Sequence, residues 1–189
     1  PFPVLNNCVI EIAVRLRRPE GGKPVHAFVE VPASLPRFVP VATTADEQVF
    51  VLLEELVMAH LGSLFPGCEI LDRFAFRLTR DMDFAVDEEG VHDLLVHIEA
   101  KLVHRRRRAP IRLELPRGCR GALAQWLRTR CGLTPAETFT LPGPHHLKDF
   151  FELIGKLKRP ELFEPEWPPQ PVPQIPAHEP VFAAIRRHG

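Results

Sequence analysis

The chain has 189 residues, of which 45% are hydrophobic and 25% are charged, and these are ordinary values for a globular protein. The length allows one domain, or one domain with an extension. The 24 basic and 24 acidic side chains balance to a formal net charge of zero. No global attraction to nucleic acid is therefore expected, and any anion binding has to be local.

The cysteines indicate the redox compartment of the protein, and the N-terminus indicates whether the chain is part of a longer one. The chain has 4 cysteines, scattered without a CxxC pair, and we interpret them as free thiols in a reducing compartment rather than as metal ligands. No apolar run approaches the roughly 20 residues needed to cross a bilayer, and no signal peptide is visible. The chain opens on Pro1 without an initiator methionine, so we expect a piece of a longer protein.

The first elements in chain order are strands. Apolar residues alternate along residues 8–17, which predicts a half-buried strand with Glu11 among the polar residues of its exposed face. A turn rich in proline and glycine at 18–24 leads into a returning strand at 25–31, so a hairpin is predicted. A short extended run follows at 37–41.

A helix is predicted next, before a long strand. Thr44 and Glu47 have the spacing of a capping box, and apolar residues recur at helical intervals from Phe50 to Leu61. The strand that follows the break at 65–67 carries Phe74, Phe76 and Leu78 on one face.

The second half of the chain alternates helices and strands. Residues 87–104 have the pattern of an amphipathic helix, 111–115 alternate as a strand, and a further helix is predicted at about 119–131. An extended run at 137–141 and a last helix at about 145–157 complete the domain.

The C-terminal part differs in composition. Eight of the 21 residues from Pro160 to Pro180 are prolines, which excludes a helix interior or a central strand there. Residues 182–187 could begin a new element. We therefore predict an α+β fold, with a mixed β-sheet and packed helices at 1–158 and a proline-rich extended tail at 159–189.

Charged residues gather where the long strand ends. The stretch "FAFRLTRDMDFAVDEEG" at 74–90 places Arg77, Arg80, Asp81 and Asp83 close together. This stretch has four possible interpretations: a catalytic carboxylate pair, a metal site, an anion-binding cluster or a salt-bridged turn. We favour the salt-bridged strand end, because the arginines can pair with the carboxylates and no third acidic ligand is evident.

A second basic cluster is the run Arg105, Arg106, Arg107 and Arg108. Arginine forks can hold phosphates through paired hydrogen bonds, whereas basic residues at a helix end also complement the helix dipole. His145 and His146 are interpreted as a helix-start pair, because adjacent helical residues do not face the same way. The sequence shows neither a nucleophile motif nor a glycine-rich phosphate loop.

Several segments together resemble a known family. "VPASLPRFVPV" (31–41), "FPGCEIL" (65–71), "FRLTRDMDFAVDEE" (76–89), "IRLEL" (111–115) and "LPGP" (141–144) are similar, in order and spacing, to the middle or head domain of bacterial type 1 polyphosphate kinases. The closing "PVFAAIRRHG" is similar to the lead-in to the first catalytic domain of that family.

The resemblance implies a role within a larger enzyme. That family is a reversible ATP:polyphosphate phosphotransferase, a phosphoprotein that uses ATP and Mg²⁺ and a phosphohistidine located in other domains. No catalytic residue, metal site or cofactor is therefore carried over to this chain. The expected partners are the remaining domains of the same enzyme, a second subunit contacted through the head domain, and polyphosphate. The expected location is the cytoplasm, with membrane association of the full enzyme as an alternative.

The resemblance also assigns roles to the charged clusters. Arg77, Arg80 and Arg105–Arg108 are candidates for the polyphosphate path or the subunit interface, and Asp81 and Asp83 are candidates for structural salt bridges. One alternative is a stand-alone polyphosphate-binding or other anion-binding module built on the arginine run. Another is a self-contained phosphoryl-transfer enzyme with His145 or His146 as acceptor, which the missing nucleotide and Mg²⁺ motifs disfavour.

Overall fold

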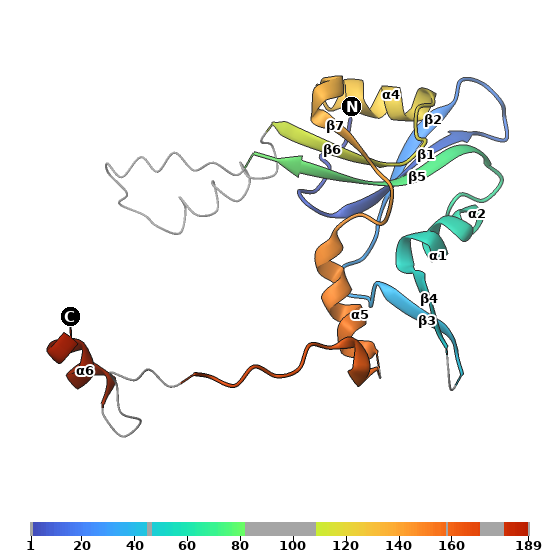
Figure 1. Cartoon of the computed structure of the whole chain (residues 1–189). Helices are drawn as coiled ribbons and strands as arrows, with labels where there is room; N and C mark the ends of the chain where they lie inside the picture. Colours follow the sequence, from blue (N-terminus) through green and yellow to red (C-terminus); the bar gives the residue numbers. More distant parts are fainter. Residues whose placement is uncertain (1, 45–46, 82–108, 158, 171–179, 189) are drawn as a thin grey trace, which may run out of the picture. The chain divides into compact units, whose positions relative to one another are not determined.

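The structure, a computed structural model, describes residues 2–44, 47–81, 109–157, 159–170 and 180–188. It divides into two compact units, Pro1–Lys156 and Leu157–Gly189. The predicted helix at 87–104 lies outside the described residues. The α+β class with a mixed sheet is confirmed (Figure 1).

The centre of the first unit is a sheet of 5 strands in the order β2-β1-β5-β6-β7. All neighbours pair antiparallel except β6 and β7, which are parallel, so the sheet is mixed as predicted. The strands match the alternating segments of the sequence: β1 Ile10–Arg17, β2 Val25–Glu30, β5 Glu69–Arg80, β6 Pro110–Pro116 and β7 Thr138–Leu141.

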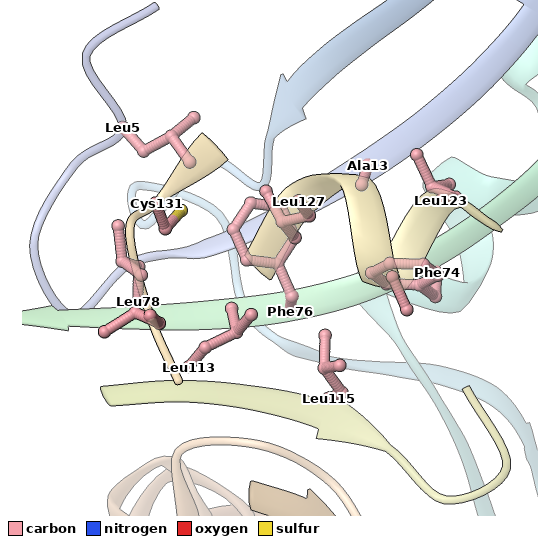
Figure 2. Close-up of a cluster of buried hydrophobic side chains, with 12 residues drawn as sticks. Leu5, Ala13, Phe74, Phe76, Leu78, Leu113, Leu115, Leu123, Leu127 and Cys131 are labelled. Atoms are coloured by element: carbon pink, nitrogen blue, oxygen red, sulfur yellow. The ribbon is translucent and has the colours of Figure 1, made fainter. Parts of the chain in front are cut away.

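One hydrophobic cluster lies between the sheet and helix α4, Ala122–Arg130. Figure 2 shows Leu123 and Leu127 of this helix among the side chains of Phe74 and Phe76 from β5. Each of these leucines is fully buried, and burying such a side chain stabilises the fold by about 1.5–3 kcal/mol. Residues 74, 76, 78 and 80 of β5 therefore face α4.

A second cluster covers the other face of the sheet. Ile12 and Val14 of β1 pack there with Leu53 and Leu61 of the helices α1, Leu53–Ala59, and α2, Leu61–Leu64. Strand β1 is thus buried on both faces, because it is an interior strand with helices on either side. The predicted exposed face of β1 was wrong at Glu11, which is only 5% exposed.

The predicted helix start at Thr44 was also wrong. Residues 48–52 form strand β4, Gln48–Leu52, paired with β3, Phe38–Thr43, and α1 begins only at Leu53. The Thr44 amide donates a hydrogen bond to the Glu47 carbonyl oxygen at 2.8 Å. A short apolar run is compatible with the period of a helix and with that of a strand. The β-branched residues of this run favour the strand.

The remaining elements follow the predicted order. The last helix of the first unit is split into a 3-10 turn, η2, and a helix, α5. In the second unit a 3-10 turn, η3, is followed by residues without regular structure up to 170, and residues 180–188 end in α6. The bounds are η1 Pro135–Glu137, η2 Leu147–Asp149, α5 Phe150–Lys156, η3 Pro160–Leu162 and α6 Val181–His188.

Candidate functional site

A charged cluster lies on neighbouring positions of β5 and β6. Arg77 of β5 is paired in register with Glu114 of β6, and Thr79 with Arg112. Arg77, Arg112 and Glu114 share the face of the sheet opposite α4, because they alternate with the residues that pack on that helix. Glu114 Oε1 accepts a hydrogen bond from Arg112 Nε at 2.8 Å and lies 3.6 Å from Arg77 Nη1.

A cavity of about 620 Å³ opens beside this cluster. Arg77, Arg112 and Glu114 line it, and residues 141–144 and 146–148, which include His146 and Lys148, form the rest of its wall. Among the described residues that line it, Arg77, Arg112 and Lys148 are basic and Glu114 is the single carboxylate. We call this cavity, with Arg77, Arg112, Glu114 and Lys148, the basic cavity.

The wall of the basic cavity is held in place by a buried arginine. Arg37 is 5% exposed, and both ends of its guanidinium fork reach Glu54, with Nε 3.2 Å from Oε2 and Nη2 2.5 Å from Oε1. Its Nη1 donates to the His145 carbonyl oxygen at 2.6 Å and to Asp149 Oδ2 at 2.9 Å. The Arg37 amide also donates to Glu152 Oε2 at 3.1 Å.

This arrangement fixes the charge of Arg37. Burial alone would lower the pKa of its guanidinium, but the hydrogen bonds and charges of Glu54 and then Asp149 raise that pKa above its ordinary value. Arg37 thus stays protonated and fastens the segment 145–152 to α1. Sequence reasoning did not single out Arg37, although it lies in the segment "VPASLPRFVPV" (31–41), one of those on which the resemblance rests.

The two adjacent histidines have different environments. His145 is 4% exposed, and its Nε2 lies 3.1 Å from the Ala75 carbonyl oxygen. Its Nδ1 has no hydrogen-bond partner among the described residues and lies 3.9 Å from Glu114 Oε2. Burial lowers the pKa of His145, so the ring is neutral at physiological pH. His146 adopts a left-handed backbone, φ 54°, and pairs with Asp149.

The other predicted residues have separate locations. Arg80 is buried, and its Nε donates to the Leu5 carbonyl oxygen at 3.0 Å while its amide donates to Asn7 Oδ1 at 2.8 Å. Arg80 thereby holds the N-terminal segment and lies on the face away from the basic cavity. The amide of Asp81 donates to the Ala109 carbonyl oxygen at 3.1 Å.

Part of the predicted charge cluster is not described. Asp83 and Arg105, Arg106, Arg107 and Arg108 lie outside the described residues. Their roles, and the pairing of Asp81 and Asp83 with the strand-end arginines, stay predictions. The structure pairs Arg77 instead with Glu114, a partner that only the strand register could reveal.

The described residues contain neither a metal-binding cluster nor a membrane-spanning helix. Within the part of the chain that the structure describes, no group of three or more His, Cys, Asp or Glu residues could hold a metal ion. None of the described helices is long and apolar enough to span a bilayer. The cysteines are free thiols, and burial raises the pKa of Cys131 to about 11.

The fold defines an α+β domain with helices on both faces of a mixed sheet and a basic cavity at one face. Comparison with known proteins gives the family. The family described as "Polyphosphate kinase middle domain" matches residues 1–153, and the chain belongs to this family.

Individual relatives of the chain are polyphosphate kinases, in agreement with the family match. The polyphosphate kinase of Thermosynechococcus vestitus is 38% identical over 180 residues, covering 93% of this chain and 24% of that protein. The polyphosphate kinase of Mycobacterium ulcerans is 34% identical over 190 residues, covering 97% and 25%. The crystal structure of polyphosphate kinase from Porphyromonas gingivalis has a similar fold, with a TM-score of 0.59 at 22% identity, covering 89% of this chain and 23% of that one. The chain thus spans about a quarter of the length of these relatives.

Proposed function

We propose that the chain is the non-catalytic head domain of a polyphosphate kinase and contributes to its dimerisation. The full enzyme transfers the γ-phosphate of ATP reversibly to inorganic polyphosphate through a phosphohistidine outside this chain. The other domains supply the sites for ATP and Mg²⁺, and the enzyme works in the cytoplasm. The free cysteines agree with a reducing compartment.

The observation that carries this proposal is the structural use of the two central histidines. A phosphate acceptor needs an accessible ring nitrogen next to a nucleotide. His145 is buried with its Nε2 against the Ala75 carbonyl oxygen, and the His146 Nδ1 lies 2.8 Å from Asp149 Oδ1. Both residues fasten the segment that carries α5, which is a scaffold role.

A chimera tests the proposal. The chain would replace the corresponding segment of the Thermosynechococcus vestitus enzyme, to which it is 38% identical. We expect the chimera to make polyphosphate from ATP and Mg²⁺ and to form dimers in light scattering. The 189-residue chain alone should make no polyphosphate and take up no acid-labile phosphate.

Two outcomes would contradict the proposal. Acid-labile phosphate on His145 or His146 of the isolated chain would make the chain itself a phosphotransferase. A monomeric chimera with full activity would remove the dimerisation role. A chimera lacking 1–156 is the matched negative control.

A further inference from the structure

We propose that the basic cavity binds the phosphate groups of a condensed phosphate chain through Arg77, Arg112 and Lys148. The cavity and its charges are properties of this chain alone. The choice of condensed phosphate over another polyanion rests on the proposed function. This site differs from the arginine run at 105–108, and it uses residues that three separate segments bring together.

The first argument is the number of hydrogen-bond donors left over. Each guanidinium has five N–H donors. Arg112 uses its Nε on Glu114 Oε1, and neither of its Nη groups has a partner among the described residues. Among the described residues, the contacts of the Arg77 guanidinium are long, 3.4 Å from Nε to the Cys8 carbonyl oxygen and 3.6 Å from Nη1 to Glu114 Oε1. One carboxylate thus leaves most of both forks available for an oxyanion.

The second argument is the spacing of the cations. Arg77 and Arg112 are diagonal neighbours on adjacent strands, because Arg77 is paired with Glu114, two residues after Arg112. Diagonal neighbours are about 7–8 Å apart at the backbone, within reach of long side chains. Two forks at this separation can bind neighbouring phosphates of one chain, and paired N–H donors suit phosphate oxygens.

The third argument is preorganisation. Arg77 has only 19% of its side chain exposed, and the Arg112 guanidinium carbon lies 4.2 Å from the centre of the Phe139 ring. Both side chains are therefore restrained before a ligand arrives, which reduces the entropy lost on binding. Lys148 on η2 is exposed and lines the same cavity. The volume of about 620 Å³ is in the range of pockets for small ligands.

Calorimetric titration of the 189-residue chain tests the inference. The probes are inorganic tripolyphosphate and ATP, at low and at physiological salt. We expect binding of tripolyphosphate that weakens as salt rises, as contacts between cations and phosphates do. The double variant Arg77→Gln/Arg112→Gln should bind at least tenfold more weakly. Arg130→Gln, an exposed arginine at the end of α4 on the opposite face, is the matched control and should bind normally.

Glu114→Gln provides a test of opposite sign. Removing the one carboxylate frees Arg77 and Arg112, so tripolyphosphate should bind several-fold more tightly. Arg112→Gln alone serves if the double variant unfolds, because 43% of the Arg112 side chain is exposed. Thermal melts of each variant separate lost binding from lost structure.

The outcomes are distinct. Tighter binding of tripolyphosphate than of ATP assigns the site to condensed phosphate, and equal binding assigns it to a triphosphate from either source. Absence of binding, or binding that the Arg77 and Arg112 changes do not alter, overturns the inference. Loss only on substitution of Arg105–Arg108 would also overturn it. None of these results changes the outcome expected for the chimera, so the two proposals can fail separately.

Discussion

Glu11 is a carboxylate in the interior of the sheet, and its burial has a consequence for stability. Burial raises the pKa of Glu11 from 4.5 to about 7, and the nearby Glu30 adds to the rise, while the Asn6 amide and the charge of Arg80 oppose it. The folded state therefore binds the proton more tightly than the unfolded state. Stability from this group is fully present below pH 4.5 and is lost as the pH rises to about 7.

We expect Glu11→Gln to remove the loss of stability that the buried Glu11 carboxylate causes as the pH rises. One pKa unit corresponds to about 1.4 kcal/mol, so the variant should be more stable than the parent by roughly 3 kcal/mol at pH 8 and nearly equal to it at pH 4.5. The glutamine oxygen can still accept the hydrogen bond from the Asn6 amide. Urea unfolding across this pH range measures the difference.

The control for Glu11 is Glu20, an exposed glutamate in the turn before β2. Glu20→Gln also removes one carboxylate and is measured over the same pH range. His145 titrates in the opposite sense, because its lowered pKa costs stability as the pH falls below 6.5. Comparing each variant with its parent at the same pH cancels that contribution. An equal slope in Glu11→Gln and the parent would refute the assignment to Glu11.

At the scale of elements, Arg37 joins α1 to the segment that carries α5. Arg37→Met would leave the carboxylate of Glu54, itself 2% exposed, buried without its cation. Breaking a buried pair in this way costs about 3–5 kcal/mol. We expect a loss of that size in urea unfolding, together with faster amide hydrogen exchange in α5, because the Arg37 side chain also donates to Asp149 and to the His145 carbonyl oxygen.

A double variant and an exposed pair provide the controls. Arg37→Met combined with Glu54→Gln should lose less than the sum of the single changes, since no buried charge is stranded. Arg17→Met breaks the Arg17–Glu69 pair, whose side chains are 48% and 60% exposed, and should cost less than about 1 kcal/mol. A small effect of Arg37→Met, similar to that of Arg17→Met, would show that the network does not fasten the two elements.

At the scale of the whole molecule, the sequence predicted most of the sheet. Apolar residues stand at every second position of 10–16 in β1, 74–78 in β5 and 111–115 in β6, and this spacing fits the period of a strand. The boundary at Leu53 could not be predicted, because β4 and α1 share one apolar run and only pairing with β3 separates them. The burial of Glu11 likewise depends on helices packing on both sheet faces.

The candidate site was predictable only in part. Arg77 was identified because it precedes a charged strand end, but its partner Glu114 lies 37 positions later and is brought opposite it by strand register. Lys148 and Arg37 gave no local signal, since a single basic residue in a loop is common. Such clusters depend on long-range pairing, which a periodic pattern does not encode.

The division of the chain leads to a final prediction. Both hydrophobic clusters are drawn from residues of the first unit, from Leu5 to Leu133 in one and from Ile10 to Ala75 in the other. We therefore expect a chain ending at Lys156 to unfold in one cooperative transition. Its Tm should lie within about 4 °C of that of the 189-residue chain. For a protein of this size, such a difference corresponds to a change of about 1 kcal/mol in the free energy of unfolding. Differential scanning calorimetry of both chains measures this. A control ending at Gly132 lacks β7 and α5 and should not melt cooperatively. A Tm far lower in the chain ending at Lys156 would place stabilising contacts in residues 157–189 and move the domain boundary toward the C-terminus.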